Sequence, residues 1–149
     1  MEETRHRQWL WILLAGGVAY LIIGQVFAFF AGAAASANTR LAWRLAAWIL
    51  SGVLFTLHIR FERTRFHSTA KTTAMRTSLA VGLGAFLIAV VAIARTRVNP
   101  APISLRLLAL VLFPLITMLP AFLVAFVLAS TLWKPRPSTA SEAKREFQK

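Results

Sequence analysis

The sequence predicts an all-α polytopic membrane protein, a four-transmembrane-helix bundle with short loops. Three observations support this prediction. Four long apolar stretches, each without a carboxylate, take up most of the 149 residues. Each approaches or exceeds the ~20 apolar residues that a helix needs to cross a hydrocarbon core of about 30 Å. Charged residues make up only 15% of the chain, whereas soluble domains typically carry about 25%.

The apolar stretches define one transmembrane domain, residues 1–133, followed by a polar, basic cytoplasmic tail, residues 134–149. The second stretch is short once Arg44 is counted, so we expect that arginine to snorkel outward to the headgroups. We expect the second and third helices to extend past the bilayer as a hairpin that turns near His67–Thr69, where Ser68 and Thr69 offer caps. The predicted spans are about 9–37, 41–59, 75–95 and 105–133.

Charge and aromatic residues predict the orientation. With four spans, both tails and the middle loop share one side, which holds twelve Lys and Arg residues against five on the other. The positive-inside rule therefore predicts a multi-pass protein of the plasma (inner) membrane with both termini cytoplasmic. Trp9, Trp11 and Trp133 fall at the predicted cytoplasmic interface and Trp43 near the opposite one. Trp48 lies deeper, and we expect it to pack against a neighbouring helix.

The first apolar stretch has a second interpretation, as a signal peptide. Ala35-Ser36-Ala37 resembles a small-x-small cleavage site. The apolar region before it is about twice the usual 7–15 residues, and Glu2 and Glu3 offset the charge of Arg5 and Arg7. A retained helix is the better prediction, with cleavage as the alternative.

Composition argues against several functional classes. The net charge of +12 sits beside apolar spans, where anionic headgroups at the cytoplasmic face are the natural partners, and no P-loop, RNP or zinc-finger pattern points to nucleic acid. The chain has no cysteine, so it has no disulfide and no thiolate metal site. It has no aspartate, so no Ser/His/Asp set is available. We expect neither catalysis nor a cofactor.

The five glutamates all lie outside the apolar stretches, and Glu62 is expected to stand alone in the middle loop. Coupled transport usually places an ionisable residue in mid-membrane, and none is predicted here. A haem held by two histidines is also disfavoured, because only His58 lies near a span.

Helix packing provides the strongest positive signal. Four small residues recur every fourth position on the first helix, and such a stripe lets two backbones approach closely in lipid. Contact with the chain's own helices is the first interpretation, and an oligomer or partner interface is the alternative. Ser78/Gly82 and Ala80/Gly84 form weaker versions on the third helix. The stripe is Gly24, Ala28, Gly32 and Ser36.

The middle loop concentrates basic residues. Arg60, Arg63 and Arg65 form either the ordinary basic collar of a cytoplasmic loop or a lipid-headgroup or phosphate site. His58 and Glu62 are one helical turn apart, so a metal site with His67 is a further alternative, although His67 falls on another face of a continuous helix.

Two prolines and one glutamine stand out inside the apolar spans. Pro114 and Pro120 each remove a backbone hydrogen bond from the fourth helix, and we expect static kinks in which Thr117 re-satisfies one freed carbonyl. Gln25 is expected to be a buried amide that holds the first helix to a neighbour.

In length and helix count the chain resembles small multidrug transporters and small fluoride channels. The resemblance covers architecture only. The sequence has no counterpart to the membrane-embedded glutamate of the first family or to the polar-and-phenylalanine ion track of the second.

These observations favour a non-catalytic protein that acts through helix packing, as a subunit or assembly factor of a membrane complex or as a homo-oligomer. The alternative is a small oligomeric channel or passive transporter for a small solute. That solute would be anionic, given the arginines on the outer side, which are Arg44, Arg95, Arg97 and Arg106.

Overall fold

The computed structural model describes residues 2–66, 68–95 and 102–131, and every regular element in these segments is an α-helix. Each helix is longer than the ~20 residues that cross a bilayer, and each contains a window apolar enough to do so. The predicted all-helical class and the four long apolar helices are confirmed. The helices are α1 (Glu2–Ala33), α2 (Ala37–Phe66), α3 (Ala70–Arg95) and α4 (Ile103–Thr131).

The helix ends follow from hydroxyl caps. Ser36 Oγ accepts a hydrogen bond from the Thr39 amide at 3.1 Å and so caps α2. The predicted first span is therefore too long at its end, because α1 stops at Ala33 and Ser36 caps the next helix, which begins at Ala37. Thr69 caps α3 in the same way, with its Oγ1 3.3 Å from the Thr72 amide. α2 ends just before the predicted turn and α3 begins just after it. One residue of that turn, His67, lies outside the described residues.

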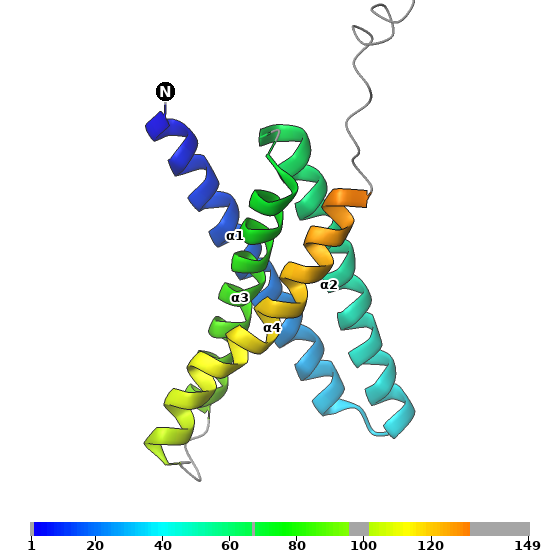
Figure 1. Cartoon of the computed structure of the whole chain (residues 1–149). Coiled ribbons are helices and arrows are strands. Elements are labelled where there is room, and N and C mark those ends of the chain that lie inside the picture. The colour runs from blue at the N-terminus through cyan, green and yellow to red at the C-terminus, as the bar shows by residue number, and fades with distance from the viewer. Residues whose placement is uncertain (1, 67, 96–101, 132–149) are drawn as a thin grey trace, which may run out of the picture.

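The four helices run alternately up and down (Figure 1). The start of α1, the α2–α3 turn and the end of α4 lie at one end of the bundle, which we call the closed end. The α1–α2 turn, the end of α3 and the start of α4 lie at the other, which we call the open end. At the open end the α1–α2 turn is far from the start of α4, so that α1 and α4 cross as an X in this view.

α3 is the central helix because it carries small residues on two faces. On one face, a Cβ added to Gly82 would lie 2.8 Å from Met118 Sδ of α4. On the other, a Cβ added to Gly84 would lie 2.6 Å from Tyr20 Cβ and 3.1 Å from the Gly17 carbonyl oxygen of α1. Only glycine permits such approaches, so both neighbours pack closely on α3.

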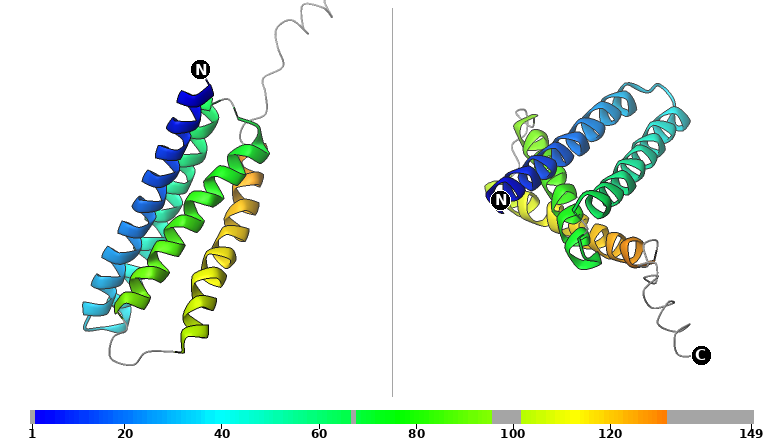
Figure 2. Two further views of the ribbon diagram at one scale, coloured as in Figure 1. Left: turned by 90° about the vertical axis from the view of Figure 1, so that its left-hand side faces the viewer. Right: turned by 90° about the horizontal axis from the view of Figure 1, so that it is seen from above.

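α2 meets α3 and α4 mainly at the closed end, where Ile59 is buried with Ala74 of α3 and with Ala125 and Ala129 of α4. At the open end α2 is held to α1 by aromatic contacts, with the Trp43 ring 4.9 Å from Phe30 and 5.9 Å from Phe27. Figure 2, seen from above, shows the α1–α2 hairpin turning away from α4 towards this end.

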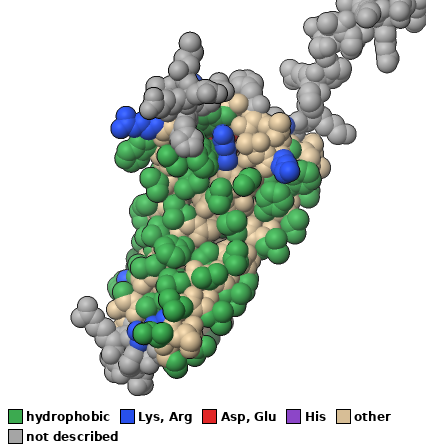
Figure 3. Space-filling model, turned by 60° about the vertical axis from the view of Figure 1, so that its left-hand side comes forward, with side chains coloured by type: hydrophobic (Ala, Val, Ile, Leu, Met, Phe, Trp, Pro, Cys, Tyr) green, Lys and Arg blue, Asp and Glu red, His purple; other side chains and the backbone are tan. Residues whose placement is uncertain are grey.

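The surface has a simple distribution of side chains. Figure 3 shows hydrophobic side chains over the middle of one face and Lys and Arg near its two ends. This is the pattern expected of a protein with an apolar belt at membrane depth and cations at headgroup depth.

Candidate functional site

A buried ion pair closes the α2–α3 hairpin. Arg76 Nη1 donates a hydrogen bond to Glu62 Oε2 at 3.2 Å, with the Glu62 side chain fully buried and that of Arg76 26% exposed. The expectation that Glu62 stands alone in a loop is therefore wrong, because the residue lies inside α2 and faces α3. We call Glu62 and Arg76 the polar clasp.

Aromatic rings bring α1 into the same site. The Arg76 guanidinium carbon lies 5.4 Å from the centre of the Trp9 ring and 5.6 Å from that of Phe66. Cation–π attraction of this kind strengthens as the cation loses water. The polar clasp thus joins three helices around one arginine.

His58 lies one turn before Glu62 on α2 and packs between α1 and α3. A Cβ added to Gly16 would lie 3.2 Å from the His58 ring and 3.3 Å from Ala80 Cβ. His58 is 8% exposed, so it is a core residue of the closed end rather than part of a solvated collar.

Three buried oxygen atoms beside the polar clasp have no hydrogen-bond partner. They are Glu62 Oε1, Thr73 Oγ1 and Thr77 Oγ1. Thr73 and Thr77 lie on the face of α3 that also carries Ala80 and Gly84, and this face packs against α1. Buried polar atoms are usually paired, so these three unpaired oxygens are exceptions among the described residues of the closed end.

The proposed metal ligands do not come together in the part of the chain that the structure describes. His58 and Glu62 are one turn apart, but the described segments contain no group of three His, Cys, Asp or Glu side chains that could hold an ion. His67 lies outside them.

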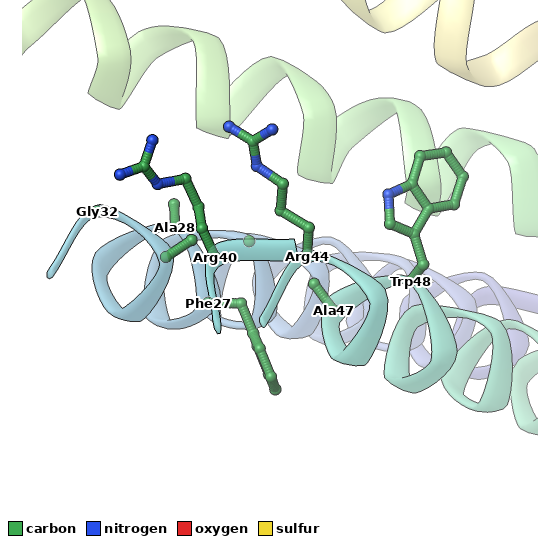
Figure 4. A pocket seen from close by; sticks show the side chains of 9 residues that line it. Phe27, Ala28, Gly32, Arg40, Arg44, Ala47 and Trp48 are labelled. Carbon is green, nitrogen blue, oxygen red and sulfur yellow. The ribbon is translucent and has the colours of Figure 1, made fainter. Parts of the chain in front are cut away.

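A second candidate site, which we call the lateral groove, lies at the open end between α1 and α2 (Figure 4). Its volume is about 610 Å³. Arg40, Arg44 and Trp48 project to the same side of the hairpin, and each lies about one helical turn from the next. The groove is lined by Gly24, Phe27, Ala28, Ala31, Gly32, Arg40, Arg44, Ala47 and Trp48.

The groove changes the interpretation of two sequence predictions. Trp48 is 79% exposed, so none of the described helices of this chain is the neighbour against which it is predicted to pack. Arg44 is exposed, as a snorkelling arginine would be, but its guanidinium lies over the groove. The reason is the divergence of the hairpins, which leaves no α4 side chain to cover the inner face of α2 here.

The small-residue stripe is divided among three roles. A Cβ added to Gly24 would lie 2.7 Å from Ile88 of α3, so this position packs within the chain. Ala28 and Gly32 line the groove, and nothing lies within 4 Å of a Cβ added to Gly32. Ser36 caps α2 and is not on α1 at all. Two further close contacts of α1 with α3 come from Gly16 and Gly17, which the four-residue spacing missed.

The three arginines of the middle segment do not converge on one site. Arg63 Nη1 donates to the Ser68 carbonyl oxygen at 2.8 Å and so holds the α2–α3 turn. Arg60 and Arg65 are exposed and five residues apart, which places them about 140° apart around the helix. A single phosphate between all three would need this turn to rearrange.

The remaining sequence predictions concern α4 and Gln25. α4 continues as one helix through Pro114 and Pro120. Thr117 Oγ1 donates to the carbonyl oxygens of Phe113 at 3.0 Å and Pro114 at 2.9 Å. The prolines free the carbonyls four residues back, at Leu110 and Ile116. The prediction that Thr117 re-satisfies one of these carbonyls is therefore wrong. Gln25 is only half-buried, because it lies where α1 leaves the packed part of the bundle.

Comparison of the chain with known protein families, with curated proteins and with solved structures finds no match.

Proposed function

We propose that this chain is a non-catalytic integral membrane protein that acts by packing against another transmembrane segment. It would serve as a subunit or assembly factor of a membrane complex, or associate with copies of itself. In the inner membrane its closed end would face the cytoplasm, because both tails and the middle segment carry most of the positive charge.

One observation carries the proposal, namely an unpartnered face in the middle of α2. Trp48 is 79% and Ile49 69% exposed, and Leu45 beside them is 53% exposed. Gly52 lies on the same side, with nothing within 4 Å of an added Cβ. Glycine permits close helix approach in lipid, and tryptophan is a frequent anchor of interfaces. We call Leu45, Trp48, Ile49 and Gly52 the docking face.

The position of Trp48 supports this interpretation. It lies eleven residues from the start of α2, which is about 16 Å along the helix axis. Tryptophans that contact lipid concentrate at the membrane interfaces, because their N–H prefers the headgroup region. An exposed tryptophan near the middle of a span is better explained by a protein partner.

The test is the mass of the full chain purified in mild detergent, with any protein that accompanies it. We expect a dimer, a higher oligomer or a defined hetero-complex, and we expect Gly52→Leu to reduce it to the monomer. Gly32→Leu is the matched control, because it makes the same change at an open glycine outside the docking face. A strictly monomeric wild-type chain without a co-purifying protein would contradict the proposal.

A second candidate function is an oligomeric channel or passive transporter for a small anion. It is favoured by the inner face of α2, which carries polar residues at helical spacing from the open to the closed end. Flux of a panel of common anions into proteoliposomes tests it, and the absence of selective flux would remove it. The polar residues are Arg40, Arg44, Ser51, His58 and Glu62.

A further inference from the structure

We infer that the lateral groove binds one anionic phospholipid, with its phosphate at Arg40 and Arg44 and an acyl chain along the apolar wall. This site is separate from the docking face except for Trp48, which borders both. The inference therefore stands or falls independently of the proposed function.

The charge of the groove has no counterpart among the residues that the structure describes. Arg40 and Arg44 are four residues apart on α2, and Figure 4 shows both guanidinium groups on one side of the hairpin. Neither forms an ion pair with another residue of the described segments. Glu62 lies eighteen residues from Arg44 on α2, which is about 27 Å along the helix. Arginine pairs suit phosphate because their planar donors bind its oxygens in pairs.

The rest of the groove is apolar and of limited size. Its other lining residues are glycine, alanine, phenylalanine and tryptophan, with no polar side chain among them. The volume of about 610 Å³ falls in the ~300–1,000 Å³ range of small-ligand sites. Five turns of a transmembrane helix, about 10 Å across and 27 Å long, occupy roughly 2,000 Å³. The groove therefore fits a lipid chain better than a whole helix.

The described residues of a second copy do not supply the missing anion. Glu62 is the one carboxylate whose side chain the structure describes, and in a copy of the same orientation it lies at the closed end, opposite Arg40. Phospholipid is the anion that a bilayer always supplies, so it is the occupant that we infer.

The experiment is native mass spectrometry of the full chain in detergent with equal amounts of phosphatidylglycerol and phosphatidylcholine. We expect the wild-type chain to retain one phosphatidylglycerol in preference to phosphatidylcholine by roughly tenfold or more, the size expected of two arginines facing an anionic lipid. Arg40→Gln with Arg44→Gln should abolish the preference. Gly32→Leu should reduce retention of either lipid, because it fills the groove without changing charge.

Two control variants separate a site from general surface charge. Arg60→Gln with Arg65→Gln removes the same charge at the closed end, and Gly52→Leu adds the same volume on the docking face; both should keep the bound lipid. Equal retention of the two lipids by the wild type would overturn the inference. An equal loss of bound lipid in the Arg60/Arg65 variant, or unchanged lipid retention in the Gly32→Leu variant, would also overturn it. So would displacement of the bound lipid by glycerol phosphate as effective as displacement by phosphatidylglycerol. Loss of a protein partner, rather than of lipid, in the Arg40/Arg44 variant would assign the groove to an acidic helix instead.

Discussion

The closed and open ends of the bundle use the same helices in opposite ways. At the closed end α2 buries Ile59, His58 and Glu62 against its neighbours, and the polar clasp joins it to α3. At the open end the same face of α2 carries Arg40 and Arg44 and meets neither α3 nor α4 closely. The spacing of the residues is alike, and their chemistry is what differs.

The difference indicates what would close a helix bundle in lipid, the environment that we propose for this chain. Apolar burial gives little drive there, because the surrounding chains are as apolar as leucine. Small residues and paired charges therefore decide where helices meet. The closed end has both, in Ala74, Ala125, Ala129 and the polar clasp. On α2 the open end has instead two like charges, Arg40 and Arg44, and no carboxylate is among the described residues there.

The largest expected effect comes from overfilling the contact between α1 and α3 near the middle of α3. In Gly84→Leu the new side chain begins 2.6 Å from Tyr20 Cβ and 3.1 Å from the Gly17 carbonyl oxygen, so α1 must move. We expect a loss of about 3 kcal/mol or more in the free energy of unfolding, measured by denaturation in mixed micelles. Gly32→Leu, at the open end, should change it little. Similar losses at both glycines would mean that the two ends are equally packed.

Breaking the polar clasp should have the next largest effect. Glu62→Gln leaves the Arg76 guanidinium largely buried without its carboxylate. Because Arg76 is 26% exposed, we expect a cost between the ~1 kcal/mol of an exposed pair and the ~3–5 kcal/mol of a buried one. The double variant with Arg76→Gln should lose less than the sum of the two single variants. Additive losses would show that the two residues act separately.

Removing the unpaired hydroxyls should change stability in the other direction. Thr73→Val and Thr77→Val each replace a buried, unpartnered hydroxyl by a methyl group of similar shape. We expect each to raise the midpoint of thermal unfolding, by a stabilisation of about 1 kcal/mol. A lower midpoint would mean that the hydroxyls hold a water molecule or an ion beside Glu62.

The smallest effect concerns the turn at the open end. Ser36→Ala removes the hydroxyl that caps α2, which typically costs about 1 kcal/mol and less where water replaces it. We expect local loosening of the α1–α2 turn, seen as faster amide hydrogen exchange at Thr39. Unchanged exchange at Thr39 would show that the cap is not needed.

Much of the fold was predictable, because the spans depend on length and apolar composition alone. The turn between Phe66 and Ala70 followed from its cap residues. The end of the first helix did not, because an alanine-rich run continues through Ala33 to Ala37 and only the Ser36 hydroxyl breaks it.

The site was harder to predict. Glu62 and Arg76 are fourteen residues apart, on opposite sides of a turn that the sequence itself located, and pairing them across the hairpin would have revealed the polar clasp. The lateral groove had no such signal. It depends on the angle between two hairpins, and the close contact of α1 with α3 at Gly17, Tyr20 and Gly84 lies outside the groove.

The central claim is that the chain crosses the membrane with its closed end in the cytoplasm. The sequence has no cysteine, so single cysteines report position without interference. Asn38→Cys at the α1–α2 turn and Ser68→Cys at the α2–α3 turn would be treated with a membrane-impermeant maleimide in intact cells. We expect labelling at residue 38 at once, and at residue 68 only after the membrane is opened. The reverse pattern, or immediate labelling of both, would contradict the account.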